Sequence, residues 1–161
     1  MNYLICYVML LFIYDGATSQ SYLKTQERSI MERKQVCKLI VEKETFVDKH
    51  LLLALSFRES RLTFALPNKK KCGGPFGLHI RWCRNKRRCD YINDSIFLLE
   101  DMFIQNNHDP LKAIYQYATG KKLKQKQTFK YGKEVLKLSN QIKMIDDLIL
   151  ALFAYKMLIY K

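Results

Sequence analysis

The sequence has few residues of the kinds that divide a chain into separate parts. Its 161 residues include only 3 prolines and 6 glycines, and these do not gather into a Pro-, Gly- or Ser-rich linker. We also find no internal repeat and no low-complexity tract. A chain of this length without a linker predicts one domain, and its hydrophobic content of 48%, with 10 Tyr and 9 Phe, is enough to fill an ordinary core.

The N-terminal apolar run is too short to cross a membrane. Residues 3–14 form a twelve-residue apolar stretch, whereas a membrane-spanning helix needs about 20 residues. The run is followed by Ala17-Thr18-Ser19, which offers small residues for cleavage after Ser19, although no Lys or Arg precedes it. We therefore expect residues 1–19 to be a signal peptide, rather than an uncleaved anchor or a buried first helix. Residues 20–161 would be the mature domain, secreted, periplasmic or in the cell envelope.

The cysteines lack the Cys-x-x-Cys spacing of zinc sites, and only one histidine, His79, lies near them in the sequence. We therefore expect no metal, and no cofactor is indicated. Loss of Cys6 with the signal peptide would leave an even number of cysteines, as is typical of disulfide-bonded exported proteins. In a reducing compartment they would remain thiols. We expect two of the three cysteines near the glycine-rich turn to pair, and Cys37 to bond to the third. These three are Cys72, Cys83 and Cys89.

Acidic residues are few compared with basic ones. The chain has 15 Asp and Glu against 28 Lys and Arg, a net charge of +13, and the basic residues cluster at residues 69–71, 81–88 and 121–133. Such a surface favours polyanions, which include nucleic acid, anionic lipid heads and acidic cell-wall polymers. A merely solubilising face is the alternative. Trp82, within the second cluster, could stack on a sugar or a base, or could anchor a loop in the core.

The apolar periodicity and the capping residues predict a mainly helical fold. A surface helix is expected within residues 20–44, and Asp48 should cap a helix that reaches Arg61. Asp90 should cap a helix to about residue 106, and Asp109-Pro110 should begin another that ends at Gly120. From residue 135 the apolar spacing predicts a long amphipathic helix, with a bend near residues 139–140.

The helix after Asp48 carries the clearest chemical signal. Residues 51–57 leave it no polar face, so it should be buried nearly all round. Glu59 stands at its end, where desolvation would raise the pKa of the carboxyl and keep it available as an acid. The alternative is a structural ion pair with Arg58 or Arg61.

Three short motifs follow in an order that resembles a known family. Glu59-Ser60 ends the buried helix, Gly74-Pro75-Phe76-Gly77-Leu78 forms a turn, and Tyr117-Ala118-Thr119-Gly120 ends a later helix. Tyr131, followed by Val135-Leu136, stands where that family has a further tyrosine-containing helix. Over about residues 45–138 the chain resembles the lytic transglycosylases, relatives of goose-type lysozyme that cut peptidoglycan. It departs from that family at His79-Ile80, which replace Met-Gln, and at Ala118, which replaces Asn.

The resemblance implies a mainly α fold, the α+β lysozyme-like type, with one helical domain, a catalytic cleft and a short loop or strand region. Glu59 would be the single acid and base that cleaves the β-1,4 MurNAc–GlcNAc bond and leaves 1,6-anhydromuramyl ends. The implied substrate-binding residues are Ser60, Gly77, Leu78 and Tyr117, with the Tyr117 hydroxyl holding the acid or a sugar oxygen. The partner would be peptidoglycan glycan strands, with peripheral contact to the cell envelope and no nucleic acid.

Two other classes of function remain open. In a two-carboxylate lysozyme, Asp90 or Asp94 would be the second acid, and the products would carry free reducing ends. A non-catalytic basic module would bind glycan or nucleic acid, with steep salt dependence in the latter case. The expected export signal disfavours nucleic acid.

Overall fold

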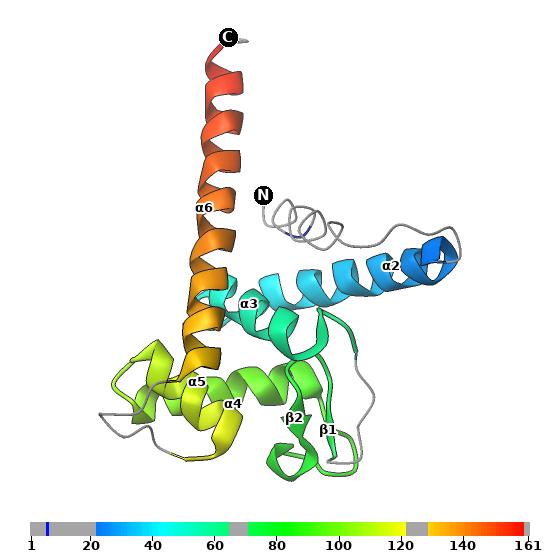
Figure 1. Cartoon of the computed structure of the whole chain (residues 1–161), viewed down its shortest axis with the longest axis vertical. Coiled ribbons are helices and arrows are strands. Elements are labelled where there is room, and N and C mark those ends of the chain that lie inside the picture. The colour runs from blue at the N-terminus through cyan, green and yellow to red at the C-terminus, as the bar shows by residue number, and fades with distance from the viewer. Residues whose placement is uncertain (1–5, 7–21, 65–70, 122–128, 160–161) are drawn as a thin grey trace.

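The computed structural model describes Cys6 and residues 22–64, 71–121 and 129–159. In these ranges the fold is mainly helical with a small two-stranded sheet (Figure 1). The helices are α2 (Tyr22–Val41), α3 (Lys49–Ser60), α4 (Tyr91–Gln105), α5 (Pro110–Thr119) and α6 (Lys130–Ile159). The strands are β1 (Cys72–Gly73) and β2 (Leu78–His79), and a short 3-10 helix, η1 (Ile80–Trp82), follows them.

Helix α3 lies at the centre of the fold, as its sequence predicts. Every residue from Leu51 to Ser56 is buried, and α3 packs against both α2 and α6. Helix α5 packs on both α4 and α6, and so connects these two helices. A helix without a polar face is stable in water only when other elements surround it, and α2 and α6 provide that cover.

The predicted capping residues are confirmed. The carboxylates of Asp48, Asp90 and Asp109 accept hydrogen bonds from the backbone N–H groups of Leu51, Asn93 and Lys112, at 3.0–3.1 Å. Gly120 ends α5 with a left-handed backbone, φ +70°, a conformation that glycine adopts without steric cost. Local hydrogen bonding therefore sets these helix ends.

Helix α6 begins five residues before the predicted start and runs without interruption through residues 139–140, so the expected bend is not present. Its first half is packed, with Val135 and Ile142 buried. The imidazole of His50 lies 3.2 Å from both Asp48 and Asp146, which joins the beginning of α3 to the middle of α6. Beyond that point α6 extends past the other elements (Figure 1), and Leu148, Leu152 and Tyr155 are exposed.

The glycine-rich segment forms a short antiparallel hairpin. Cys72 pairs with His79 and Gly73 with Leu78. Phe76, in the turn, is completely buried and anchors the hairpin to the core. The following loop is closed by a disulfide between Cys83 and Cys89, which confirms that two of the cysteines near the turn are paired.

The prediction for Cys37 is wrong. Cys37 lies on α2 and forms a disulfide with Cys6, rather than with a third cysteine near the turn. The error arose because Cys6 was assigned to a signal peptide and so removed from the pairing.

The rest of the predicted signal peptide, residues 1–19, lies outside the described residues, and so does most of the basic cluster at residues 121–133. No helix in the described ranges combines the length and apolar character needed to cross a membrane.

Candidate active site

Glu59 is the next-to-last residue of α3, and a sharp change of direction follows it. Arg61 and Leu62 both have a left-handed backbone with φ of 60°, which costs a non-glycine residue roughly 1–2 kcal/mol. Leu62 is fully buried, and this burial offsets the strain. The turn ends α3 at a defined residue and fixes the last turn of the helix, which carries Glu59.

The Glu59 carboxylate lies between two groups that come from distant parts of the chain. The hydroxyl of Tyr131, in the first turn of α6, donates a short hydrogen bond to its Oε1. Gly77, in the hairpin, lies against the other oxygen: a Cβ at this position would be 2.8 Å from Oε2. The backbone of Gly77 also has φ +62°, so its conformation favours glycine, and a Cβ here would displace the Glu59 carboxylate.

Burial raises the pKa of Glu59, and this is the largest influence on it. The hydrogen bond from Tyr131 and the charge of Arg58 act in the opposite direction and lower the pKa. Glu59 as a residue is exposed to solvent, yet its carboxylate is crowded by protein atoms at Gly77 and Tyr131. The local desolvation of the carboxylate, rather than the exposure of the whole residue, determines its proton affinity. The group is therefore accessible and retains its proton to higher pH than an ordinary glutamate.

Arg58, the neighbour of Glu59, is held by another partner. Its Nη2 donates to Oε2 of Glu134 on α6 at 2.6 Å, and its guanidinium lies 5.9 Å from the centre of the Tyr131 ring. Arg61 instead lies over the ring of Phe57 at 4.8 Å. The ion pair with Arg58 or Arg61 that was considered for Glu59 is therefore not formed.

Tyr117 lies near Glu59 but does not hold it. Its hydroxyl donates to the backbone carbonyl of Phe76 at 3.0 Å, which fastens the hairpin to α5. Burial raises the pKa of Tyr117 well above its usual value, a hydrogen bond with Ser95 opposes the rise, and the charge of Glu59 adds to it. The hydroxyl that holds the acid belongs to Tyr131, which the sequence motifs do not mark as a site residue.

Ser60 and Leu78 have structural roles here. The Ser60 hydroxyl donates to the carbonyl of Ser56 at 3.2 Å and accepts from the N–H of Thr63 at 3.1 Å. The side chain of Leu78 is buried, so only its backbone can contact a ligand. The substrate-binding roles of Ser60, Gly77, Leu78 and Tyr117 stay predictions.

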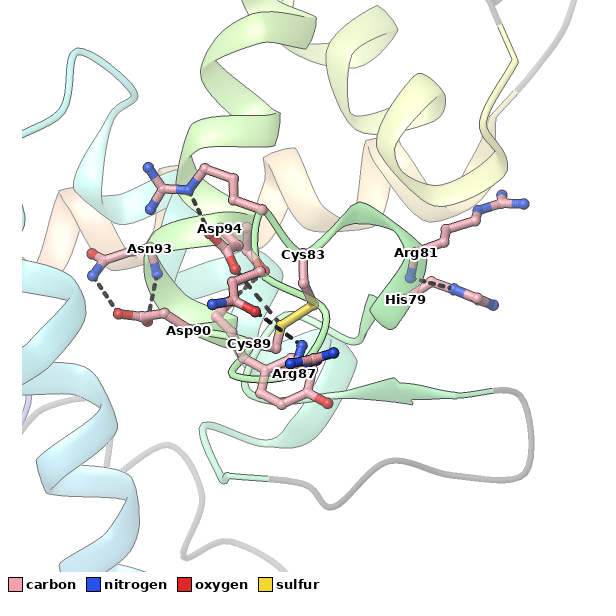
Figure 2. The surroundings of a disulfide bond; sticks show 12 residues. His79, Arg81, Cys83, Arg87, Cys89, Asp90, Asn93 and Asp94 are labelled. Carbon is pink, nitrogen blue, oxygen red and sulfur yellow. Dashed lines mark hydrogen bonds and ion pairs between the residues drawn. A yellow bond between two sulfur atoms is a disulfide. The ribbon is translucent and has the colours of Figure 1, made fainter.

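The two aspartates considered as second acids lie at the beginning of α4, around the disulfide (Figure 2). Asp90 caps α4 and also accepts from the amide of Asn93 at 2.6 Å. Asp94 is buried and bound to Nε of Arg84 at 2.6 Å. Neither aspartate contributes to the pKa shift of Glu59, which comes from burial, Tyr131 and Arg58. Both carboxylates are thus used in local structure.

One group of potential metal ligands occurs in the described part of the chain. The ligand atoms of Cys83, Cys89 and Asp94 lie within 4.8 Å of one another. Both sulfurs are consumed by the disulfide, so they cannot serve as the thiolates that a soft metal ion requires.

His79, which replaces a residue of the family motif, has a local partner. Its Nδ1 accepts the N–H of Arg81 at 3.1 Å and caps η1. Figure 2 shows His79 and Arg81 directed away from the disulfide. His79 therefore stabilises the turn after β2.

No protein-family model matches the chain, and no curated protein or solved structure matches it either. The geometry around Glu59 is consequently the basis for a functional proposal.

Proposed function

We propose that this protein is an exported, peptidoglycan-cleaving enzyme of the lytic transglycosylase kind, with Glu59 as its only acid and base. The observation that supports the proposal best is the environment of Glu59. A carboxylate with a raised pKa ends a buried helix, receives a hydrogen bond from Tyr131 and lies against a glycine. A lysozyme-like arrangement of helices around a sugar-binding cleft would place the scissile bond beside this carboxylate.

The first step assigns the proton to the leaving group. Protonated Glu59 would donate its proton to the glycosidic oxygen as the C1–O bond breaks and an oxocarbenium-like centre develops. Tyr131 would keep the carboxyl oriented throughout, because its hydroxyl binds one oxygen and leaves the other for the sugar. Because Gly77 has no Cβ, the space beside Oε2 that a side chain would fill stays open for the substrate.

The second step returns the proton to Glu59. The carboxylate would take the proton of the muramyl C6 hydroxyl, whose oxygen then attacks C1 and closes the 1,6-anhydro ring. No water is consumed and one carboxyl group is sufficient. The use of Asp90 and Asp94 in capping and ion pairing supports this one-acid mechanism over the two-carboxylate hydrolase.

The test is digestion of purified peptidoglycan with mass analysis of the released muropeptides. Wild type should release products with 1,6-anhydro ends, and Glu59→Gln should fold normally yet lose cleavage by about 10²–10⁴-fold or more, the usual contribution of general acid–base catalysis. Glu100→Gln on α4 makes the same substitution elsewhere and should keep full activity.

Two results would contradict the mechanism. Free reducing ends, together with a comparable loss of activity in Asp94→Asn, would indicate a hydrolase. If wild type cuts no peptidoglycan, and the Glu59→Gln variant binds it as tightly as wild type does, the protein would be a non-catalytic glycan-binding protein. The replacement of the motif Gln by Ile80 and of the motif Asn by Ala118 favours that second candidate.

A further inference from the structure

A disulfide closes a strongly basic loop at the end of the hairpin. We call residues 81–89 the basic loop. Its cations are Arg81, Arg84, Lys86, Arg87 and Arg88, and it contains no acidic residue. The Cys83–Cys89 bond spans a sequence separation of 6, and within it the N–H of Arg87 donates to Asn85 Oδ1 at 3.0 Å while that of Arg88 donates to the Asn85 carbonyl at 3.1 Å. The backbone of the basic loop is thus fixed by a covalent bond and a turn.

One cation of the basic loop holds the loop in place. The Nε of Arg84 donates to the buried carboxylate of Asp94 at 2.6 Å, and the Arg84 guanidinium lies 5.3 Å from the centre of the Phe97 ring. Figure 2 shows Asp94 beside the disulfide at the beginning of α4. Arg84 therefore joins the basic loop to the core, and its charge is neutralised by Asp94.

Three other cations have no such neutralisation. Lys86, Arg87 and Arg88 are exposed, and none of them forms an ion pair with any residue in the described ranges, whereas Arg84 does. Three adjacent positive charges on a rigid backbone repel one another, and a bound anion would relieve this repulsion. Their arrangement fits a ligand that carries several negative charges in a row.

The basic loop also borders a hollow of about 650 Å³. Its lining includes Arg88, Phe64 and Lys43, which follows α2. Asp90 is the acidic group in this lining, and its carboxylate already accepts two hydrogen bonds from Asn93. The hollow extends the cationic surface from the basic loop toward Lys43.

We propose that the basic loop binds a linear phosphate polymer through its phosphate groups, with Lys86, Arg87 and Arg88 as the contact residues. Arginine matches phosphate oxygens with two parallel hydrogen bonds, and a polymer with one charge per unit can reach all three cations. The Arg81 guanidinium lies 5.2 Å from the centre of the Trp82 ring and covers one of its faces, although 45% of Trp82 is exposed. Stacking on bases would thus have the other face of a single ring, whereas phosphate groups would have three cations. A phosphate polymer without bases is therefore the ligand that the surface fits.

The experiment measures binding of fluorescently labelled inorganic polyphosphate to the full-length, oxidised protein by anisotropy over a range of salt concentrations. In the triple variant Lys86→Gln/Arg87→Gln/Arg88→Gln, affinity at about 0.15 M salt should fall on the order of 10- to 50-fold. The slope of log K against log salt should become shallower by about 2, since each phosphate contact contributes about 0.7.

The matched control removes the same charge from another exposed surface. The triple variant Lys137→Gln/Lys143→Gln/Lys156→Gln, with all three changes on α6, should change affinity by less than about threefold, because distant exposed charges are screened at this salt concentration. An equal loss in both triple variants would show that net charge alone attracts the polymer and would overturn the proposal. Polyglutamate that binds as tightly as polyphosphate would overturn the choice of phosphate, and a single-stranded oligonucleotide that binds more tightly than base-free polymer would overturn the exclusion of bases.

This inference is independent of the proposed cleavage activity. The Glu59→Gln variant should bind polyphosphate with the affinity of wild type, because neither Glu59 nor its partners touch the basic loop through any contact described above. Failure of glycan cleavage would leave the binding result unaffected, and loss of polyphosphate binding in the basic-loop variant would leave cleavage of isolated peptidoglycan intact.

Discussion

Gly77 combines a left-handed backbone with close contact to the Glu59 carboxylate. Substitution Gly77→Ala should cost roughly 1–2 kcal/mol of folding free energy through the backbone conformation. It should also displace the carboxylate, because the new Cβ would be 2.8 Å from Oε2 and the glutamate side chain can move more easily than the hairpin backbone. We expect reduced stability in denaturant unfolding together with at least a tenfold loss of glycan cleavage.

Gly120→Ala is the matched control for this substitution. Gly120 has φ +70°, but a Cβ there would meet no atom within 4 Å. The Gly120→Ala variant should therefore lose stability as Gly77→Ala does, but should keep its glycan cleavage. Equal effects of the two substitutions on cleavage would show that the contact between Gly77 and Glu59 has no role in the activity.

Single residues show where sequence reasoning succeeds and where it fails. Asp48 and Gly120 were correctly predicted as helix ends because capping depends on residues within one turn. Tyr117 fastens the hairpin through Phe76, and the hydroxyl that binds Glu59 belongs to Tyr131. That distinction depends on how α5 and α6 pack beside α3, and local sequence patterns do not contain this information.

At the scale of elements, the site depends on how the end of α3 meets the beginning of α6. Tyr131 and Glu134 are three positions apart in the sequence (i and i+3), so their side chains project from neighbouring positions on the same face of α6. Tyr131 contacts Glu59, and Glu134 contacts Arg58. The same helical turn therefore orients the acid and pairs with the cation whose charge lowers the pKa of that acid.

Glu134→Gln should lower the pKa of Glu59. Without its ion pair, the charge of Arg58 becomes available to the adjacent carboxylate, and an unpaired cation favours the ionised form. The alkaline limb of the cleavage profile, which reports loss of the Glu59 proton, should shift to lower pH. The double variant Glu134→Gln/Arg58→Gln should shift it back upward. Both side chains are partly exposed, so the loss of stability should be no more than about 1 kcal/mol.

The direct measurement is NMR titration of the Glu59 side-chain carboxyl carbon in each variant. Glu100→Gln removes one negative charge from α4 and serves as the control, for which no shift is expected. The stability of the fold should also depend on this proton. The folded-state pKa of Glu59 is raised, so the protonated form stabilises the fold at low pH, and this stabilisation is lost as the pH rises through that pKa. An unchanged titration of Glu59 in Glu134→Gln would show that the ion pair between Arg58 and Glu134 does not affect the Glu59 pKa.

At the scale of the whole molecule, one disulfide closes a local loop and the other joins distant parts of the chain. Cys83–Cys89 closes a short loop, while Cys6–Cys37 spans a sequence separation of 31 and joins the N-terminal region to α2. In the chain-entropy description these crosslinks are worth about 2 and about 4 kcal/mol, respectively. The sequence predicted that two of the three cysteines near the turn pair, but not which two. It did not predict the second bond, because Cys6 lies in the segment that resembles a signal peptide.

Non-reducing peptide mapping of the full-length, oxidised chain should recover both linkages and an alkylated thiol at Cys72. Cys6→Ser should then release the thiol of Cys37 and lower the melting temperature more than Cys83→Ser does, because it opens the longer loop. Exported material that begins at Gln20 and links Cys37 to Cys72 would contradict this expectation and support the signal-peptide prediction.

The hydrogen bond between Tyr131 and Glu59 spans a sequence separation of 72. A ribosome that adds about 5–20 residues per second completes Glu59 roughly 4–14 s before Tyr131. During that interval the nascent chain carries its reactive carboxyl group without the hydroxyl that orients it. Under the proposed mechanism, the oriented acid is therefore complete only when synthesis of α6 is under way, and we expect a chain that ends before α6 to cleave no glycan.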